Sequence, residues 1–166
     1  MGRAIYLCVF LAGLFPATPR ASVLTDRDVE YLGILNQQGT QIIVDLLQSE
    51  DALNGARGNH PNIASTYCYE KLKYVMGLVT QDGDHLQSVV VVARRMVDPK
   101  DEEIMRRFAK LIAEATARRI PLLRNDVSSI TEACSDDGVI YVKMKQVLSF
   151  LDDFANVAGS IAGRAK

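Results

Sequence analysis

Apolar residues recur at intervals of three and four positions through most of this 166-residue chain, and that spacing places them on one face of an α-helix. The pattern runs over residues 29–47, 63–97, 104–134 and 140–158. Residues 139–142 are also compatible with a short strand, but no second strand is evident to pair with it. The sequence therefore predicts an all-α protein.

Helix-capping and turn-forming residues divide this pattern into segments. Thr25 followed three residues later by Asp28 is typical of a capping box, and Asp98 before a proline is typical of a helix start. Residues 49–62 are rich in Gly, Asn, Asp and Pro, so they are predicted to form the longest loop. A second turn is expected at residues 135–138.

The first 21 residues have the three-part organisation of a secretory signal peptide. A short basic start precedes an apolar run over residues 4–15, and a proline-containing stretch then ends on Ala21. About twelve apolar residues span roughly 18 Å as a helix, less than the ~30 Å hydrocarbon core of a bilayer. We expect cleavage near Ala21 and a periplasmic or secreted protein. An uncleaved anchor or a buried helix is the alternative.

Removal of residues 1–21 would leave a single domain over residues 22–166, which is long enough to bury a core. This part has 17 basic and 20 acidic residues, because the removed segment contains two arginines and no acids. A net negative charge argues against nucleic-acid binding, which needs a concentrated basic surface. No second apolar stretch is long enough to span a membrane, so no membrane-spanning helix is expected after the signal is removed.

Two cysteines remain once Cys8 leaves with the signal. Cys68 and Cys134 are an even pair in an oxidising compartment, so a disulfide between them is predicted. Two separately buried thiols are the alternative. The bridge would close a loop of about 66 residues and stabilise the fold by roughly 4 kcal/mol in the chain-entropy model.

The cysteines also help to choose a topology. Residues 81–84 are expected to interrupt the second helical segment, and Pro121 is expected to kink the third without ending it. If residues 81–84 only kink the helix, Cys68 and Cys134 lie at the same end of four helices. If they reverse the chain, five helices form and the cysteines lie toward opposite ends. The disulfide favours an antiparallel four-helix bundle with interrupted middle helices over the five-helix variant.

Metal and cofactor chemistry has weak support in the sequence. Asp82, Asp84 and His85 form the densest group of potential metal ligands. The same letters are ordinary turn and capping chemistry, which is the favoured interpretation. The chain contains no pair of Glu-x-x-His motifs and no haem-attachment motif. No cofactor is therefore predicted.

Catalytic and anion-binding patterns are similarly sparse. The acidic pairs at residues 136–137 and 152–153 could serve a hydrolase, but nothing in the sequence fixes their separation. Arginine doublets at residues 94–95, 106–107 and 118–119 suggest an anion track. Steps of twelve residues rotate successive doublets by about 120°, and glutamates precede three of these arginines by four positions. A salt-bridged, solvated face is favoured.

Exclusion leaves protein binding as the predicted function. We expect an exported non-enzymatic protein such as an inhibitor, immunity factor, chaperone or adaptor. Arg57 and His60 in the expected loop, together with a surface Tyr69, are the candidate contact residues. Tyr67 and Tyr74 are expected in the core. A bundle that binds a small ligand or metal in the cell envelope is one alternative, and a hydrolase with paired acids is the other.

Overall fold

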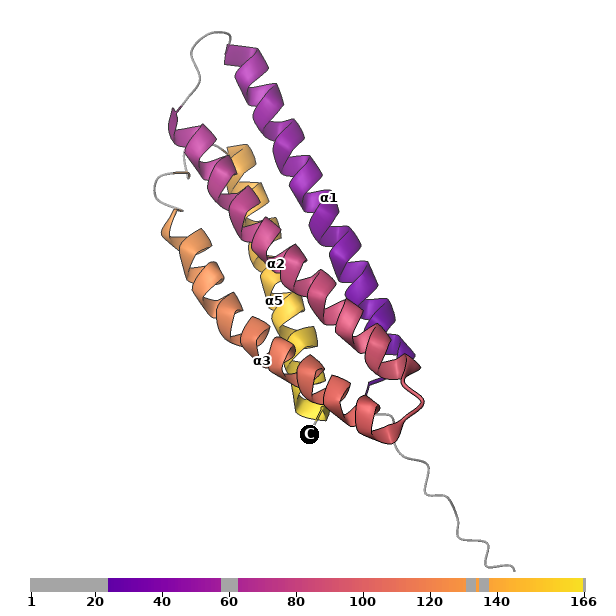
Figure 1. The fold of residues 1–166 in the computed structure, drawn as a ribbon. Coiled ribbons are helices and arrows are strands. Elements are labelled where there is room, and N and C mark those ends of the chain that lie inside the picture. Colours follow the sequence, from indigo (N-terminus) through magenta and orange to yellow (C-terminus); the bar gives the residue numbers. More distant parts are fainter. Residues whose placement is uncertain (1–23, 58–62, 131–133, 135–137, 166) are drawn as a thin grey trace, which may run out of the picture.

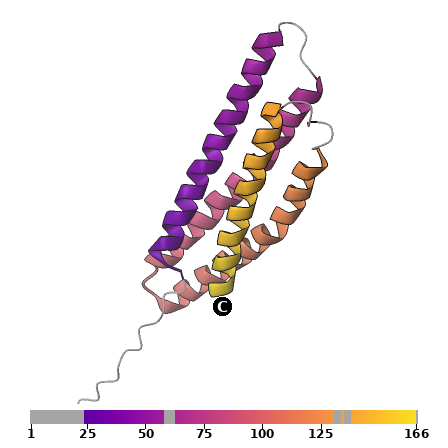
Figure 2. The same ribbon diagram turned by 180° about the vertical axis from the view of Figure 1, so that it is seen from behind.

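The computed structural model describes residues 24–57, 63–130, 134 and 138–165, and these residues form an all-α antiparallel four-helix bundle (Figure 1). The helices are α1 (Asp26–Arg57), α2 (Ile63–Arg95), α3 (Pro99–Ser129) and α5 (Gly138–Arg164). Consecutive helices pack side by side, and α5 closes the bundle against α1 (Figure 2). The predicted fold class is therefore confirmed.

Two expected breaks in the helices do not occur. α2 runs without interruption through residues 81–84, and α1 continues to Arg57 through much of the segment expected to be a loop. α3 passes through Pro121, as predicted. Residues 139–142, for which a short strand was the alternative, belong to the first turns of α5. Packing between helices outweighs the local preference of Gly, Asn and Asp for turns.

Residues 81–84 are helical, and the glycine among them is required by packing between helices. Gly83 lies where α2 meets α1, and a Cβ atom there would overlap Asn36 Oδ1 and lie 2.9 Å from Phe154 Cε2. Gly39 plays the same part on α1, where a Cβ atom would lie 2.5 Å from Thr80 Cγ2. The two glycines let the backbones approach closely, so Gly83 serves packing rather than a turn.

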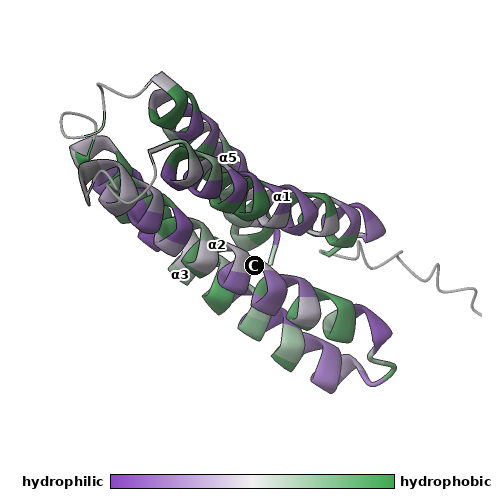
Figure 3. Ribbon diagram, turned by 90° about the horizontal axis from the view of Figure 1, so that it is seen from above, coloured by the Kyte–Doolittle hydropathy of each residue, from purple (hydrophilic) through white to green (hydrophobic). Residues whose placement is uncertain are grey.

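The core consists of two clusters at opposite ends of the bundle. The larger cluster surrounds the disulfide end and contains the long apolar and aromatic side chains of Leu46, Leu72, Met144 and Phe154. The smaller cluster lies toward the α2–α3 connection and is built partly from alanines. Its buried members are Leu24, Leu32, Leu86, Val90, Ala93, Ala109, Ala113, Ala158 and Ile161. Hydrophobic and hydrophilic residues both occur along every helix of the bundle (Figure 3).

The predicted disulfide is present. Cys68, near the start of α2, is bonded to Cys134, which follows the end of α3, and their Cα atoms are 6.1 Å apart. Both residues are buried in the larger cluster. The cysteines therefore lie at the same end of the bundle, as the four-helix topology requires.

Polar side chains cap the start of α3 and form a partly buried ion pair between α1 and α2. Asp98 Oδ1 accepts a hydrogen bond from the backbone N–H of Lys100 at 2.7 Å, which caps α3 as predicted. Between α1 and α2, the Lys73 ammonium contacts Glu50 Oε2 at 2.6 Å and Glu70 Oε1 at 2.7 Å. Burial alone would lower the pKa of Lys73, but hydrogen bonds to the two carboxylates outweigh burial and raise that pKa. Lys73 therefore supplies a hydrogen-bond partner to the buried side chain of Glu50.

Candidate functional site

One of the three residues predicted to contact a partner is buried in the core. Tyr69 is only 1% exposed and belongs to the larger core cluster, so the prediction that it lies on the surface is wrong. It shares the buried face of α2 with Leu72 and Met76, three and seven residues further on. Arg57 is the last residue of α1. His60 lies outside the described residues.

Tyr67 and Tyr74 show the reverse error. They were expected in the core, but they are 50% and 61% exposed. The face of α2 that enters the core carries Cys68 and Val75 instead. Both faces of this helix contain apolar residues, so periodicity alone did not distinguish them.

The potential metal ligands are not brought together. Both carboxylate oxygens of Asp82 accept hydrogen bonds from Arg119 Nη1 at 3.0 Å, which joins α2 to α3. Asp84 and His85 are exposed. Within the described ranges, no group of three His, Cys, Asp or Glu side chains is placed to hold a metal ion. Asp82 acts there as the partner of an arginine.

The arginine doublets form ion pairs, as the favoured interpretation predicted. Arg94 pairs with Asp26 at the start of α1, and Arg119 pairs with Asp82. The three pairs expected from four-residue spacing within α3 are all present. They are Arg106–Glu102, Arg107–Glu103 and Arg118–Glu114. These arginines therefore make a salt-bridged surface rather than a continuous anion track.

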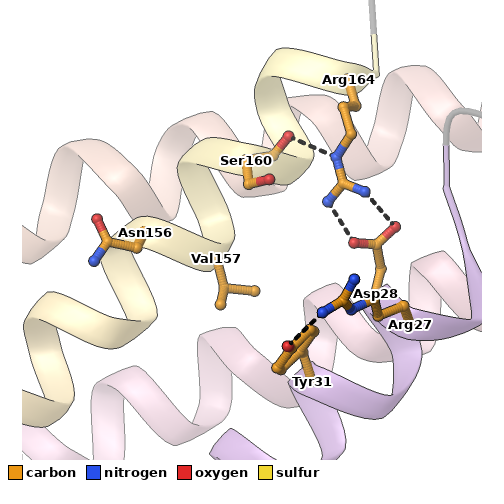
Figure 4. Close-up of a pocket in the computed structure, with 7 residues that line it drawn as sticks. All are labelled: Arg27, Asp28, Tyr31, Asn156, Val157, Ser160 and Arg164. Atoms are coloured by element: carbon orange, nitrogen blue, oxygen red, sulfur yellow. Dashed lines mark hydrogen bonds and ion pairs between the residues drawn. The ribbon is translucent and has the colours of Figure 1, made fainter.

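A pocket of about 430 Å³ lies between the start of α1 and the end of α5 (Figure 4). In its lining, the Asp28 carboxylate accepts hydrogen bonds from the guanidinium of Arg164 and from the backbone N–H of Thr25, the latter at 2.7 Å. The predicted capping contact of Asp28 with Thr25 is thus confirmed, and Arg164 joins it to α5. This arrangement joins the start of α1 to the end of α5.

The same pocket has an excess of positive charge. Arg27 donates a hydrogen bond to Tyr31 Oη at 3.1 Å, and this bond raises the pKa of its guanidinium further. Among the described residues, Arg27 makes no ion pair. An anion with an apolar body would suit this lining, so a bundle that binds a small ligand would bind it in this pocket. The Asp28 carboxylate is already satisfied, and Arg27, Asn156 and Ser160 are all exposed, so the pocket offers a new ligand little buried polar surface.

The outer side of α3 carries the most unusual surface. Four large apolar side chains lie along it: Ile104 is 54% exposed, Phe108 54%, Leu111 60% and Leu122 65%. Together with the exposed Ala115, they recur at three- and four-residue spacing, or once after seven, so they form one line on the helix. We call these five residues the α3 outer stripe. This exposed apolar line is a candidate interaction surface.

Charged residues of both signs border the α3 outer stripe. Glu103 and Arg107 precede its centre, and Glu114 and Arg118 follow it. Arg107 Nη2 contacts Glu103 Oε1 at 2.6 Å, and Arg118 Nη2 lies 3.7 Å from Glu114 Oε2. The border therefore alternates acid, base, acid, base along the helix.

Comparison with known proteins adds no assignment, because no protein-family model, curated protein or solved structure matches this chain. Within the helices that the structure describes, none has an apolar stretch long enough to cross a bilayer.

Proposed function

We propose that this chain is an exported, non-enzymatic helical protein that acts by binding an amphipathic helix of a protein partner along the α3 outer stripe. One observation carries the proposal: Ile104, Phe108 and Leu111 are each more than half exposed along one line of α3. Helices recognise such a line by packing their own apolar face against it. The charged border would then form the rim of the contact.

The charges beside the stripe favour a protein over a lipid surface. Helices that lie on membranes carry mainly Lys and Arg on their polar side, because they meet anionic lipids. The border of the α3 outer stripe instead alternates Glu103, Arg107, Glu114 and Arg118. Alternating signs are typical of helix pairs, in which each charge meets its opposite on the partner.

Export is supported by two independent features. Residues 1–21 have the basic, apolar and small-residue parts of a signal peptide. Cys68 and Cys134 are joined in a disulfide, which persists mainly in oxidising compartments. A covalently closed bundle suits a protein that must stay folded outside the cytoplasm.

Site-specific photocrosslinking in the native host tests this function. A benzophenone side chain replaces Phe108 in the exported protein, which is expected to begin near Ser22 by intact mass. We expect an adduct whose linked peptide belongs to an amphipathic helix. The purified helix should bind the wild-type protein, and the Phe108→Asp variant should bind it at least about tenfold more weakly, because burying an unpaired charge is costly.

Leu47 provides the matched control. It is an apolar residue of α1 that is 43% exposed, and α1 does not contact α3. A benzophenone at Leu47 should give no such adduct. Equal crosslinking from both positions would contradict the proposal. So would a wild-type protein that binds anionic vesicles through Phe108 and does not bind the helix.

A further inference from the structure

We infer that the helix bound by the α3 outer stripe is α3 of a second copy of this chain, packed antiparallel about a twofold axis near Lys110. The inference rests on the proposed function, because it requires that the stripe bind a helix. Two features of α3 point to a second copy: the spacing of its apolar residues and the order of its charges. A twofold interface needs a surface that is complementary to itself.

The apolar residues meet this requirement. When two α3 helices run antiparallel with Phe108 opposite Leu111 of the second copy, Ile104 lies opposite Ala115. Ile104, Phe108 and Leu111 then each face a residue of the stripe, and the same contacts recur on the other side of the axis; Leu122 lies beyond the paired segment. Because Ala115 is small, it leaves space for Ile104 between the helices. The pairing removes Ile104, Phe108 and Leu111 from water in both copies.

The charges meet the requirement more strictly. The same antiparallel alignment places Arg107 beside Glu114 of the second copy, and Glu103 beside Arg118. The twofold axis repeats both pairs, so every acid on this border meets a base. Reversing the direction of one helix would instead bring Glu103 near the other Glu103 and Arg107 near the other Arg107. The order of the charges therefore selects the antiparallel arrangement.

Within one copy, Arg107 and Glu114 do not contact each other. They lie seven residues apart, about 10.5 Å along the helix, whereas contacts within a helix join residues three or four apart. Arg107 pairs with Glu103, while Glu114 lies near Arg118 and Lys110. Any energetic coupling between positions 107 and 114 must therefore arise between copies.

Sedimentation equilibrium of the exported full-chain product, from about 1 to 100 µM, tests the inference. The wild-type protein is expected to be in monomer–dimer equilibrium. Arg107→Glu places Glu against Glu114 twice per dimer, and Glu114→Arg places Arg against Arg107 twice. Each single variant should therefore raise the dimer dissociation constant at least about tenfold.

A mixture of the two single variants gives the sharpest result. In a mixed dimer, the Arg107→Glu copy presents two acids and the Glu114→Arg copy presents two bases, so both pairs are restored. We expect the mixture to associate nearly as tightly as wild type, although neither variant does so alone. The charge-swapped double variant, with both changes in one chain, should also recover association. High salt should weaken all of these differences.

Controls separate association from folding. Leu47→Asp, on α1, should leave the dimer unchanged, and Phe108→Asp should give a monomer with unchanged circular dichroism. A wild-type protein that stays monomeric at 100 µM would overturn the inference, as would a dimer that ignores the charges at positions 107 and 114. If that monomer still crosslinks through position 108 to a helix of another protein, the proposed function stands and only the second copy is excluded.

Discussion

Replacing Cys68 and Cys134 together with alanine is expected to lower the free energy of unfolding by about 4 kcal/mol, the largest effect of any change considered for this bundle. The bridge closes a loop that spans a sequence separation of 66 residues, so its loss releases considerable chain entropy in the unfolded state. Both side chains are buried among larger apolar residues, and truncating them also removes packing contacts. Urea denaturation followed by circular dichroism measures the difference.

Reduction of the wild-type protein provides the comparison for this prediction. It breaks the bridge without removing either sulfur, so it isolates the covalent contribution from the packing contribution. We expect the reduced wild-type protein to be less stable than the oxidised form and more stable than the double variant. A double variant within about 1 kcal/mol of the oxidised wild type would show that the bridge contributes little to stability.

Gly83→Ala is expected to destabilise the bundle by about 1–3 kcal/mol, although alanine is intrinsically the better helix former. The added methyl group would overlap Asn36 Oδ1 and press on the ring of Phe154. Asn36 Nδ2 also donates a hydrogen bond to Gln87 Oε1 at 2.9 Å, and moving Asn36 would disturb that bond between α1 and α2. The midpoint of thermal or urea unfolding should fall accordingly.

Gly77 is the matched control for this change because it occupies the same helix. A Cβ atom there would meet nothing within 4 Å, and the residue is exposed. Gly77→Ala should therefore stabilise the protein by about 0.5–1 kcal/mol through helix propensity alone. The two substitutions are chemically identical and should have opposite signs. If both substitutions were stabilising, that result would contradict the close approach of α1 and α2 at Gly83.

Local sequence patterns predicted the parts of this fold in which one helix face is clearly apolar. In α5, Ile140, Met144, Leu151 and Phe154 recur at helical spacing and are buried as expected, although Val139, Tyr141 and Val142 in its first turns are exposed. The Asp98 cap and the glutamate–arginine pairs of α3 also depend on residues close in sequence. Such features are determined within one or two helical turns, so they can be predicted without knowing what packs against the helix.

Packing between helices was harder to predict. Gly83, with its acidic neighbours, has the composition of a turn, and its role became evident only from its contact with α1. On α2, residues 67 and 69 are both tyrosine, so residue type alone does not distinguish them. The partner helices determine that Tyr69 enters the core and Tyr67 does not. Tertiary contacts of this kind override local preference.

The α3 outer stripe was missed for a related reason. The helical spacing of Ile104, Phe108 and Leu111 predicted a core face, yet the core at this end takes the small Ala109 and Ala113. One signal was available in the sequence. The spacing of the stripe widens to seven residues after Ala115, with Arg118 beside the gap. The line that starts with the small Ala109 and Ala113 instead continues without a charge to Ile120, Leu123 and Val127.

The unequal size of the two core clusters gives the bundle a gradient of local stability along its axis. The end closed by the disulfide packs aromatic and long aliphatic side chains, while the opposite cluster includes Ala93, Ala109, Ala113 and Ala158, which bury little area.

Brief sub-global openings should therefore begin at the α2–α3 connection and spread toward the disulfide. Backbone amides near Ala93 and Ala109 should exchange with solvent deuterium well before those near Leu72 and Met144. The N-terminal half of α3, which carries most of the outer stripe, lies in the region that opens first. Occupation of that stripe should slow exchange at the end of the bundle where the fold alone provides least protection.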